Sequence, residues 1–345
     1  GDDGAENLVL GEETAVGQAY TEFQTYLKQL QSQGILLNVL SKNEEENAVS
    51  GLNHPQMVIK PEDFLVIRAN WEPKSVNLTE IAKELNLLPE AFVFVDDNPA
   101  EREIVRQQVP GAAVPEICKP EHSIYAIDRG GYFETTVLSA DDLKRNEMYR
   151  ENRQREKQKQ SFSNYKEYLL SLNMEAEIAP FQQVYMARIA QLTNKSNQFN
   201  LTTRRFTQKE IEQLAARDDY ITLYGKVTDC FGDNGVVSLV IGRVEKSCLH
   251  IELWLMSCRV LKRDLEYAMM DELVGQCLGR NIDTIYGYYY PTSKNGMVRN
   301  FYETQGFSKE EEDSQGNSRW IFHVTPNYEK KNTVIRLVKL GEHDE

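Results

Sequence analysis

The chain has 345 residues, which is enough for two domains of ordinary size, and 41% of its residues are apolar. Its 39 lysine and arginine residues against 53 aspartate and glutamate residues give a formal net charge of −14 at pH 7. This excess of negative charge disfavours a nucleic acid or a membrane surface as the partner, because both are polyanionic.

Cysteine usage and hydropathy predict a protein of the cytoplasm. The five cysteines are odd in number and show no Cys-x-x-Cys or Cys/His spacing, so neither a disulfide framework nor a zinc site is indicated. No apolar run approaches the roughly 20 residues that a membrane helix needs. The acidic start, residues 1–4, is the opposite of a signal peptide and is typical of the interior of a longer protein.

The first part of the chain, residues 1–128, alternates helical and strand patterns. Apolar residues recur at helical spacing up to Gly34, and Ile35 to Leu40 predicts a parallel strand buried on both faces. Asn77 and Glu80 form a capping-box pattern that predicts the start of a helix. The predicted elements are helix 15–33, strand 35–40, a helix from residue 77, strand 92–95, helix 99–108 and strand 112–114. This alternation predicts an α/β fold, a doubly wound parallel sheet.

The second part of the chain predicts a linker and a different domain. Residues 129–173 contain a helix start at Ser139 to Asp142 and a highly charged stretch, 144–160, which indicate a solvated connecting helix. From residue 174 to 345, helices are predicted at 184–192, 211–214 and 262–278, and strands at 221–228, 236–244, 249–256 and 284–290. Asp233-Asn234-Gly235 predicts a tight turn, and the tail from residue 327 is expected to be peripheral. These patterns predict an α+β domain with an antiparallel sheet.

Polar side chains follow the predicted strands of the first domain in an order typical of a phosphate and Mg²⁺ site. Ser41-Lys42-Asn43 ends one strand and offers hydrogen bonds to a phosphate, and Lys74 offers a neutralising charge. Asp96-Asp97 ends another strand, and carboxylates are ligands that Mg²⁺ prefers. Taken singly, such residues usually have no binding role: a serine after a strand is usually a cap, a lysine before a helix is usually solvated, and an acidic pair after a strand is usually a helix-start charge.

Three stretches resemble the haloacid dehalogenase superfamily, in its capless phosphatase branch (subfamily IIIC), and specifically FkbH-like proteins. They are Leu40-Ser41-Lys42-Asn43-Glu44, Asn70-Trp71-Glu72-Pro73-Lys74-Ser75-Val76-Asn77-Leu78 and Phe94-Val95-Asp96-Asp97-Asn98-Pro99-Ala100-Glu101-Arg102-Glu103. The resemblance implies that Ser41 and Lys74 belong to the family's second and third, phosphate-binding motifs. It also implies that Asp96 and Asp97 form the fourth motif and bind the metal ion.

The first motif of that superfamily is an Asp-x-Asp-x-Thr whose aspartate forms an aspartyl-phosphate, and no Asp-x-Asp pair occurs in the printed sequence. The resemblance places this motif, and the first strand of the sheet, upstream of Gly1. We therefore expect the printed sequence to be part of a longer protein. As printed, it lacks the nucleophilic aspartate of the covalent route.

The resemblance continues in the second half of the chain. Ala190 to Arg205, which reads AQLTNKSNQFNLTTRR, resembles the FkbH signature, and the surrounding pattern resembles a GNAT acetyltransferase. This implies that the strand Glu252-Leu253-Trp254-Leu255-Met256 presents backbone groups to a pantetheine arm, of coenzyme A or of a carrier protein. It also implies that Tyr302, within Phe301 to Phe307, is a proton donor to a leaving thiolate.

The turn after this strand departs from the family's Arg-x-x-Gly-x-Gly pattern for a pyrophosphate. It reads Arg259-Val260-Leu261-Lys262-Arg263-Asp264, so both glycine positions carry side chains. Asp264 repels a pyrophosphate, whereas the side chains of Lys262 and Arg263 could compensate. The resemblance also implies that Arg259, Lys262 and Arg263 belong to the residues that bind the acyl or pantetheine group. A phosphopantetheine arm, which has one phosphate, would be less affected than coenzyme A.

Cys258 lies just past the same strand. The FkbH resemblance implies transfer of a phosphoglycerate-derived glyceryl group to an acyl carrier protein, and a thiol at this position could hold the group as a thioester. Arg259 beside it would lower the pKa of a thiol. The alternative is that Cys258 is a small buried apolar residue.

The sequence thus predicts a Mg²⁺-dependent phosphatase-type domain, acting on a small phosphorylated substrate, coupled to an acyltransferase-like domain. One alternative is a phosphatase or N-acyltransferase in surface polysaccharide biosynthesis. The other is a non-catalytic binding scaffold, which the missing nucleophile and the degenerate turn favour.

Overall fold

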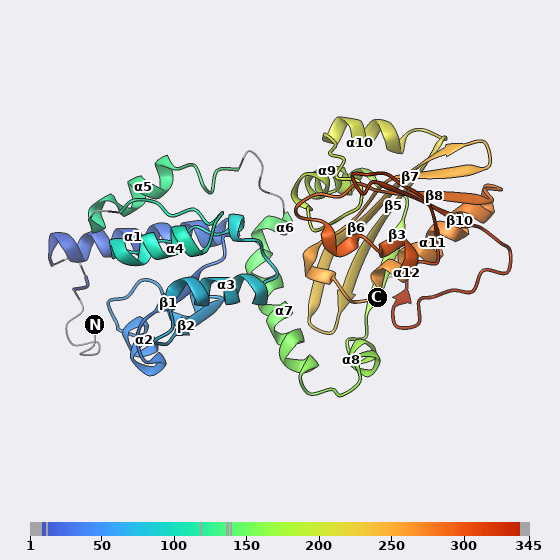
Figure 1. Cartoon of the computed structure of the whole chain (residues 1–345). Coiled ribbons are helices and arrows are strands. Elements are labelled where there is room, and N and C mark those ends of the chain that lie inside the picture. Colours follow the sequence, from blue (N-terminus) through green and yellow to red (C-terminus); the bar gives the residue numbers. More distant parts are fainter. Residues whose placement is uncertain (1–8, 12, 118, 136–137, 139, 339–345) are drawn as a thin grey trace. The chain divides into compact units, whose positions relative to one another are not determined.

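The computed structural model describes residues 9–11, 13–117, 119–135, 138 and 140–338. The chain divides into two compact units, residues 1–150 and 151–345, which are taken one at a time below (Figure 1). The helix start predicted at Ser139 lies outside the described residues. Within the described ranges, no helix has both the length and the apolar character needed to cross a membrane.

Unit 1 alternates helices with short parallel strands. Its first helix begins after Thr14, whose hydroxyl accepts the N–H of Gly17 at 3.0 Å, and ends before Gly34, which has φ +87°. The prediction of a helix at 15–33 is therefore confirmed. The elements are α1 (Ala15–Ser32), β1 (Asn38–Ser41), α2 (Glu45–Leu52), η2 (Pro61–Asp63), β2 (Val66–Ala69), α3 (Lys74–Glu84), η3 (Pro89–Ala91), α4 (Pro99–Gln108), η4 (Pro120–His122), α5 (Ser123–Arg129), α6 (Ala140–Leu143) and the first part of α7 (Arg145–Lys159).

The strands of unit 1 form two separate parallel pairings. β1 pairs with β2, with Asn38 opposite Val66, and Val93 forms a single parallel bridge with Ala113. The prediction of a buried strand at 35–40 is wrong in extent, because β1 begins at Asn38 and all four of its residues are only half-buried. In the described part of the chain β1 has β2 as its one strand partner, so its other edge is unpaired. An unpaired edge on a parallel strand is unusual, since such strands normally lie inside a sheet.

Helix α3 begins three residues earlier than the capping-box pattern predicts. The side chain of Asn77 does not cap a helix but exchanges two hydrogen bonds with the side chain of Asn70, at 2.7 and 3.2 Å. Pro73 precedes the helix, and Lys74 is therefore its first residue. Helix α4 begins at Pro99 as predicted, with the side chain of Asn98 accepting the N–H of Ala100 at 2.9 Å.

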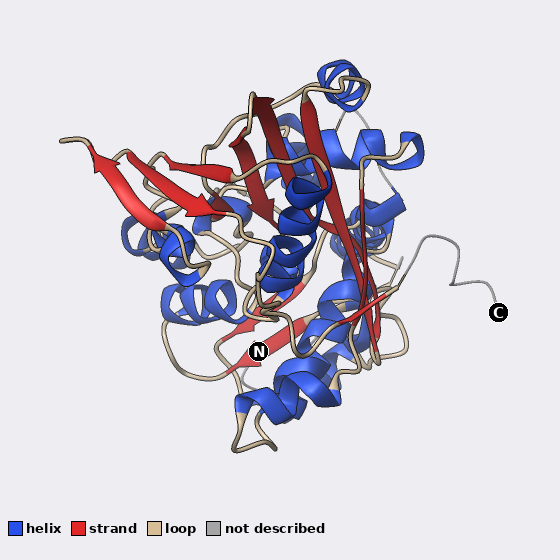
Figure 2. Ribbon diagram, turned by 90° about the vertical axis from the view of Figure 1, so that its right-hand side faces the viewer, coloured by secondary structure: helices blue, strands red, loops and turns tan. Residues whose placement is uncertain are grey.

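Unit 2 is an α+β domain built on one large sheet (Figure 2). The strand order is β11-β3-β5-β6-β7-β8-β10-β9, with β4 paired to β7, and the pairing is antiparallel except between β7 and β8 and between β3 and β11. Its elements after α7 are α8 (Tyr165–Ser171), β3 (Glu175–Ala179), η5 (Gln183–Tyr185), α9 (Met186–Lys195), β4 (Phe199–Asn200), α10 (Gln208–Ala215), β5 (Tyr220–Asp229), β6 (Gly232–Glu245), β7 (Cys248–Met256), η6 (Cys258–Val260), α11 (Leu265–Gly279), β8 (Thr284–Tyr289), η7 (Gly296–Val298), α12 (Phe301–Thr304), β9 (Ser308–Glu312), β10 (Ser318–His323) and β11 (Arg336–Leu337).

The sheet of unit 2 has a hydrophobic core on each face. On one face, α11 buries Leu265, Met269 and Leu273 in a cluster that includes Ile251 of β7. On the other face, α9 and α10 bury apolar residues such as Ile189 in a cluster that includes Leu253 of β7. Burial on both faces explains why β5, β6 and β7 are rich in apolar residues and could be predicted from the sequence.

Two sequence-based predictions about unit 2 are wrong. The turn between β5 and β6 lies at Cys230 and Phe231, whereas Asp233-Asn234-Gly235 belongs to β6, where the pairing with β5 shifts register and Gly235 has φ +67°. A β-bulge thus uses the residues that are typical of a tight turn. The tail is integrated rather than peripheral, because the buried carboxylate of Asp271 accepts the N–H groups of Lys331 and Asn332, each at 2.9 Å.

Candidate functional site

An ion pair lies where the strands of unit 1 end. Lys74, the first residue of α3, places its Nζ 2.6 Å from Oδ2 of Asp96, and both side chains are largely buried. The other oxygen of Asp96 accepts the N–H of Asn98 at 2.9 Å. Parallel strands bring their carboxyl ends to one edge, which is why residues 22 positions apart in the sequence meet here.

Asp97, beside Asp96, is exposed. The guanidinium of Arg102, which is 5% exposed, donates to the backbone oxygens of Asp96 and Asp97 at 2.8 and 3.0 Å and so fixes the loop that carries both carboxylates. Burial, and then the negative charge of Asp97, raise the pKa of Tyr20 in α1. The resemblance did not assign a role to Arg102, although it lies within the matching stretch.

The other predicted phosphate-binding residues follow β1. The carbonyl oxygen of Ser41 accepts the N–H of Asn70 at 3.0 Å, which ties the end of β1 to the loop after β2. The side chain of Asn43 accepts the N–H of Glu44 at 2.8 Å. Lys42 pairs with Glu101 at 2.5 Å, so its charge is already engaged.

The donor set at this edge fits a magnesium ion. Mg²⁺ is commonly held by one or two carboxylates, with waters and substrate phosphate oxygens completing its six ligands. Asp96 and Asp97 supply two such carboxylates. No group of three or more potential metal-binding side chains occurs among the described residues, so further ligands would be waters or substrate.

In unit 2, β7 and β8 diverge. They pair in parallel only from Cys248 to His250, and a bulge at Glu252, between the pairs Gly242–Ile251 and Ile241–Leu253, then bends β7. A gap between two diverging strands exposes backbone groups that an extended ligand can pair with. This is the position where the GNAT resemblance implies a pantetheine arm.

The chain itself occupies this gap. β4 pairs with β7, and the N–H of Leu201 donates to the carbonyl of Trp254 at 3.1 Å, while the hydroxyl of Thr202 donates to the carbonyl of Glu252 at 2.7 Å. On the opposite side, the N–H of Tyr290 donates to the carbonyl of Leu201 at 2.9 Å. Residues 199–202 therefore cover the backbone of the predicted pantetheine-binding residues Glu252 and Met256, whereas Leu253 pairs with Ile241 of β6.

A buried asparagine holds this segment in place. Asn295, with none of its surface exposed, donates from Nδ2 to the carbonyl oxygens of Asn200 and Tyr290, each at 2.9 Å. With residues 199–202 in this position, the structure does not fit a coenzyme arm between β7 and β8.

The turn after β7 keeps the backbone form of a glycine turn without glycine. Lys262 and Asp264, which stand at the family's two glycine positions, both have φ +62°. A left-handed conformation costs a non-glycine residue roughly 1–2 kcal/mol. The hydroxyl of Tyr165 donates to the carbonyl of Lys262, which is one contact that supports this turn.

Arg263, a predicted phosphate-compensating residue, is buried. Its guanidinium donates to Asp229 at 3.2 Å and to Asn152 and the carbonyl of Arg259 at 2.7 Å each. Arg155 pairs with the same carboxylate at 2.6 and 2.7 Å. Burial lowers the pKa of Arg263 to about 10. Its charge thus serves this internal network. Sequence patterns gave no signal for it because the charged partner, Asp229, lies 34 residues away in the chain.

Cys258 and Tyr302 differ in accessibility. Cys258 is half-buried in η6 and forms no disulfide. Tyr302 is fully buried between Phe301, Phe307 and the backbone of Gly287, and its hydroxyl has no hydrogen-bond partner in the described part of the chain. Burial raises the pKa of Tyr302, which leaves it protonated but without a path to solvent.

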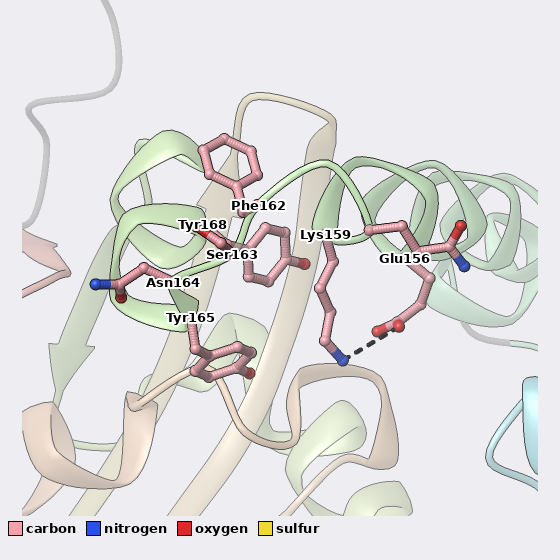
Figure 3. A pocket seen from close by; sticks show the side chains of 8 residues that line it. Glu156, Lys159, Phe162, Ser163, Asn164, Tyr165 and Tyr168 are labelled. Atoms are coloured by element: carbon pink, nitrogen blue, oxygen red, sulfur yellow. Dashed lines mark hydrogen bonds and ion pairs between the residues drawn. The ribbon is translucent and has the colours of Figure 1, made fainter.

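A pocket of about 390 Å³ lies between α7 and α8 (Figure 3). Nζ of Lys159 pairs with Glu156 at 3.3 Å and lies 5.7 Å from the ring centroid of Tyr165. Burial raises the pKa of Tyr165 to about 12. The pocket is lined by Glu156, Lys159, Gln160, Phe162, Ser163, Asn164, Tyr165 and Tyr168, none of which the sequence singled out.

Comparison with known proteins found similar solved structures, whereas no family model and no curated protein matches the chain. The N-terminal part of the protein BF1531 from Bacteroides fragilis, which contains a phosphatase domain complexed with Mg, is 41% identical over 39% of this chain, with TM-score 0.38. The match spans 37% of that chain.

Acetyltransferases are also among the similar structures. A GNAT-family acetyltransferase from Streptococcus pneumoniae is 14% identical, covering 44% of this chain and 100% of its own, with TM-score 0.36. The PaiA N-acetyltransferase from Thermoplasma acidophilum, in complex with coenzyme A, is 12% identical, covering 43% and 99%, with TM-score 0.32. The similar structures thus include both a phosphatase domain and acetyltransferases. Because these TM-scores are all below 0.5, activity is inferred from the residues of this chain alone.

Glu266, in the first turn of α11, gives unit 2 a pH-dependent stability. Burial raises the pKa of its carboxyl from 4.5 to about 7, so the folded chain retains a proton that the unfolded chain releases near pH 4.5. Stability is therefore lost as the pH rises between these values, by about 1–3 kcal/mol. We expect Glu266→Gln to be neutral at pH 4 and stabilising at pH 8, in urea unfolding monitored by tryptophan fluorescence. Equal stabilisation at both pH values would contradict this account.

Proposed function

We propose that unit 1 binds Mg²⁺ and a small phosphomonoester at the edge formed by Ser41, Lys74, Asp96 and Asp97. The ion pair between Lys74 and Asp96, 2.6 Å long and beside the exposed carboxylate of Asp97, carries this proposal. The pair lies at the carboxyl ends of the strands of unit 1, where ligands of parallel α/β sheets bind, and Asp97 places a second carboxylate next to it in the chain.

Each residue has a defined task in this proposal. The ammonium of Lys74 and the hydroxyl of Ser41 bind phosphate oxygens, Asp96 and Asp97 hold the metal ion, and Arg102 keeps their loop in place. Bound Mg²⁺ would neutralise phosphate charge. A covalent route also needs a nucleophilic carboxylate, and no Asp-x-Asp pair occurs in the printed sequence.

The finer proposal is FkbH-like. The thiolate of Cys258 attacks the acyl carbon of a bisphosphoglycerate, which forms a thioester and releases the acyl phosphate as inorganic phosphate. Unit 1 hydrolyses the remaining phosphate ester, and a carrier-protein thiol takes the glyceryl group by thioester exchange, which frees Cys258. The signature at 190–205 and the half-buried thiol of Cys258 support it. Because residues 199–202 cover β7, transfer along this strand requires that they leave it. Coenzyme A and phosphopantetheine meet the same obstacle, since both present a pantetheine arm.

Metal binding tests the proposal for unit 1. We expect Asp97→Asn to weaken Mg²⁺ binding about 10-fold or more, because it removes one of two carboxylates. We expect Lys74→Met to strengthen Mg²⁺ binding, because Lys74 competes for Asp96, while abolishing the binding of inorganic phosphate with Mg²⁺. Isothermal titration calorimetry measures both, and Glu329→Gln, at an exposed carboxylate in the other unit, is the matched control.

In Lys74→Met, a higher affinity for Mg²⁺ together with a lower affinity for phosphate distinguishes a binding site from a structural ion pair. If Lys74→Met left both affinities unchanged, the ion pair would have no part in binding. A melting curve of each variant shows whether it is folded.

A second candidate, a non-catalytic scaffold, is favoured by one observation: the gap between β7 and β8 is filled by the chain. The two candidates differ in whether residues 199–202 compete with a coenzyme.

We expect Asn295→Ala to free this segment and therefore to tighten coenzyme A binding relative to the unmodified chain, with faster hydrogen exchange at Leu201. The control is Gln315→Ala, in an exposed turn. Faster exchange without any coenzyme A binding would support the scaffold.

A further inference from the structure

An exposed tryptophan lies beside the phosphate site. Trp71 is 61% exposed, in the loop between β2 and α3 that also ends at Lys74, whereas Trp254 and Trp320 are 0% and 3% exposed. Its indole Nε1 donates to Oε1 of Glu44 at 2.7 Å. Glu44 follows Ser41 at the end of β1, so this contact joins the two loops that carry the proposed phosphate-binding residues.

The loop that carries Trp71 is held firmly. The N–H of Asn70 donates to Ser41, and the paired amides of Asn70 and Asn77 fix the next turn of chain, with Asn77 only 1% exposed. The indole is thus fixed at its N–H edge while its surface remains in water. An exposed aromatic surface loses the favourable free energy of burial, which a ligand that covers it would recover.

We propose that Trp71 and Glu44 bind the hydroxylated carbon skeleton of the phosphomonoester, so that the site selects a polyol phosphate. The indole surface packs against the C–H groups of the skeleton. Oε2 of Glu44, to which the described residues donate no hydrogen bond in the structure, accepts a substrate hydroxyl. The two residues together are specificity determinants, and no bond is made or broken by either.

This inference rests on the proposed phosphate and Mg²⁺ site of unit 1. The supporting geometry is the placement of these residues at the ends of two paired strands. Ser41 and Glu44 lie at the end of β1, and Trp71 and Lys74 follow β2. A phosphate between Ser41 and Lys74 would leave its ester group next to the only two side chains that bridge these loops by a side-chain hydrogen bond in the described ranges.

The fluorescence of Trp71 can report ligand binding directly, because the other two tryptophans are buried. We expect glycerol 3-phosphate, with Mg²⁺, to change the emission of the chain and to bind about tenfold more tightly than propyl phosphate, which lacks the hydroxyls. Trp71→Phe should abolish the emission change, and Glu44→Leu, which has no hydrogen-bonding group, should remove the preference for glycerol 3-phosphate. Calorimetry with inorganic phosphate gives the affinity of the phosphate site alone, which we expect both variants to retain.

The outcomes separate this inference from the proposed function. The specificity role is overturned, while the phosphate site stands, if inorganic phosphate and Mg²⁺ bind but glycerol 3-phosphate and propyl phosphate bind equally. It is also overturned if Trp71→Phe keeps the emission change or if Glu44→Leu keeps the preference for glycerol 3-phosphate. If no phosphate compound binds in the presence of Mg²⁺, the proposed function is overturned and this inference with it.

Discussion

The ion pair between Lys74 and Asp96 is the constraint on which the site of unit 1 depends. It joins the first residue of α3 to the end of the segment paired with Ala113, and it keeps the charge of a largely buried carboxylate compensated. A buried charge without a partner is strongly unfavourable, so this lysine and this carboxylate have to be placed together. The same contact sets up a competition, because an ion that binds Asp96 must share it with Lys74.

Unit 2 has two features of the backbone that are typical of a ligand site, but the polar groups at both are already hydrogen-bonded within the chain. The left-handed turn at Lys262 and Asp264 persists, but Arg263 is held by Asp229 beneath it. β7 and β8 also diverge, but residues 199–202 lie between them and hydrogen-bond to the backbone of β7 and of Tyr290. The engagement of Arg263 and the filling of the gap explain why fold alone does not decide the function of unit 2.

Sequence patterns predicted the elements that depend on local signals. Helices α1 and α4 have standard caps, and β5 and β7 are apolar enough to be recognised. The start of α3 was missed because Asn77 pairs with Asn70, a tertiary contact that outweighs a capping pattern. The order of Ser41, Lys74 and Asp96 indicated a shared edge, since parallel strands end together. The burial of Arg263 and the filling of the gap by β4 arise from residues far apart in the sequence, which no local pattern reports.

The central claim is that Asp96 and Asp97 hold a divalent ion against which a phosphate binds at Lys74. A crystal structure of the chain grown with Mn²⁺ and inorganic phosphate tests it directly, because Mn²⁺ is located by its anomalous scattering. The account predicts an anomalous peak about 2.2 Å from an oxygen of each carboxylate, with phosphate oxygens between this peak and Nζ of Lys74. A chain with Mn²⁺ bound elsewhere, or with the pair between Lys74 and Asp96 unchanged and both ligands absent from this edge, would contradict it.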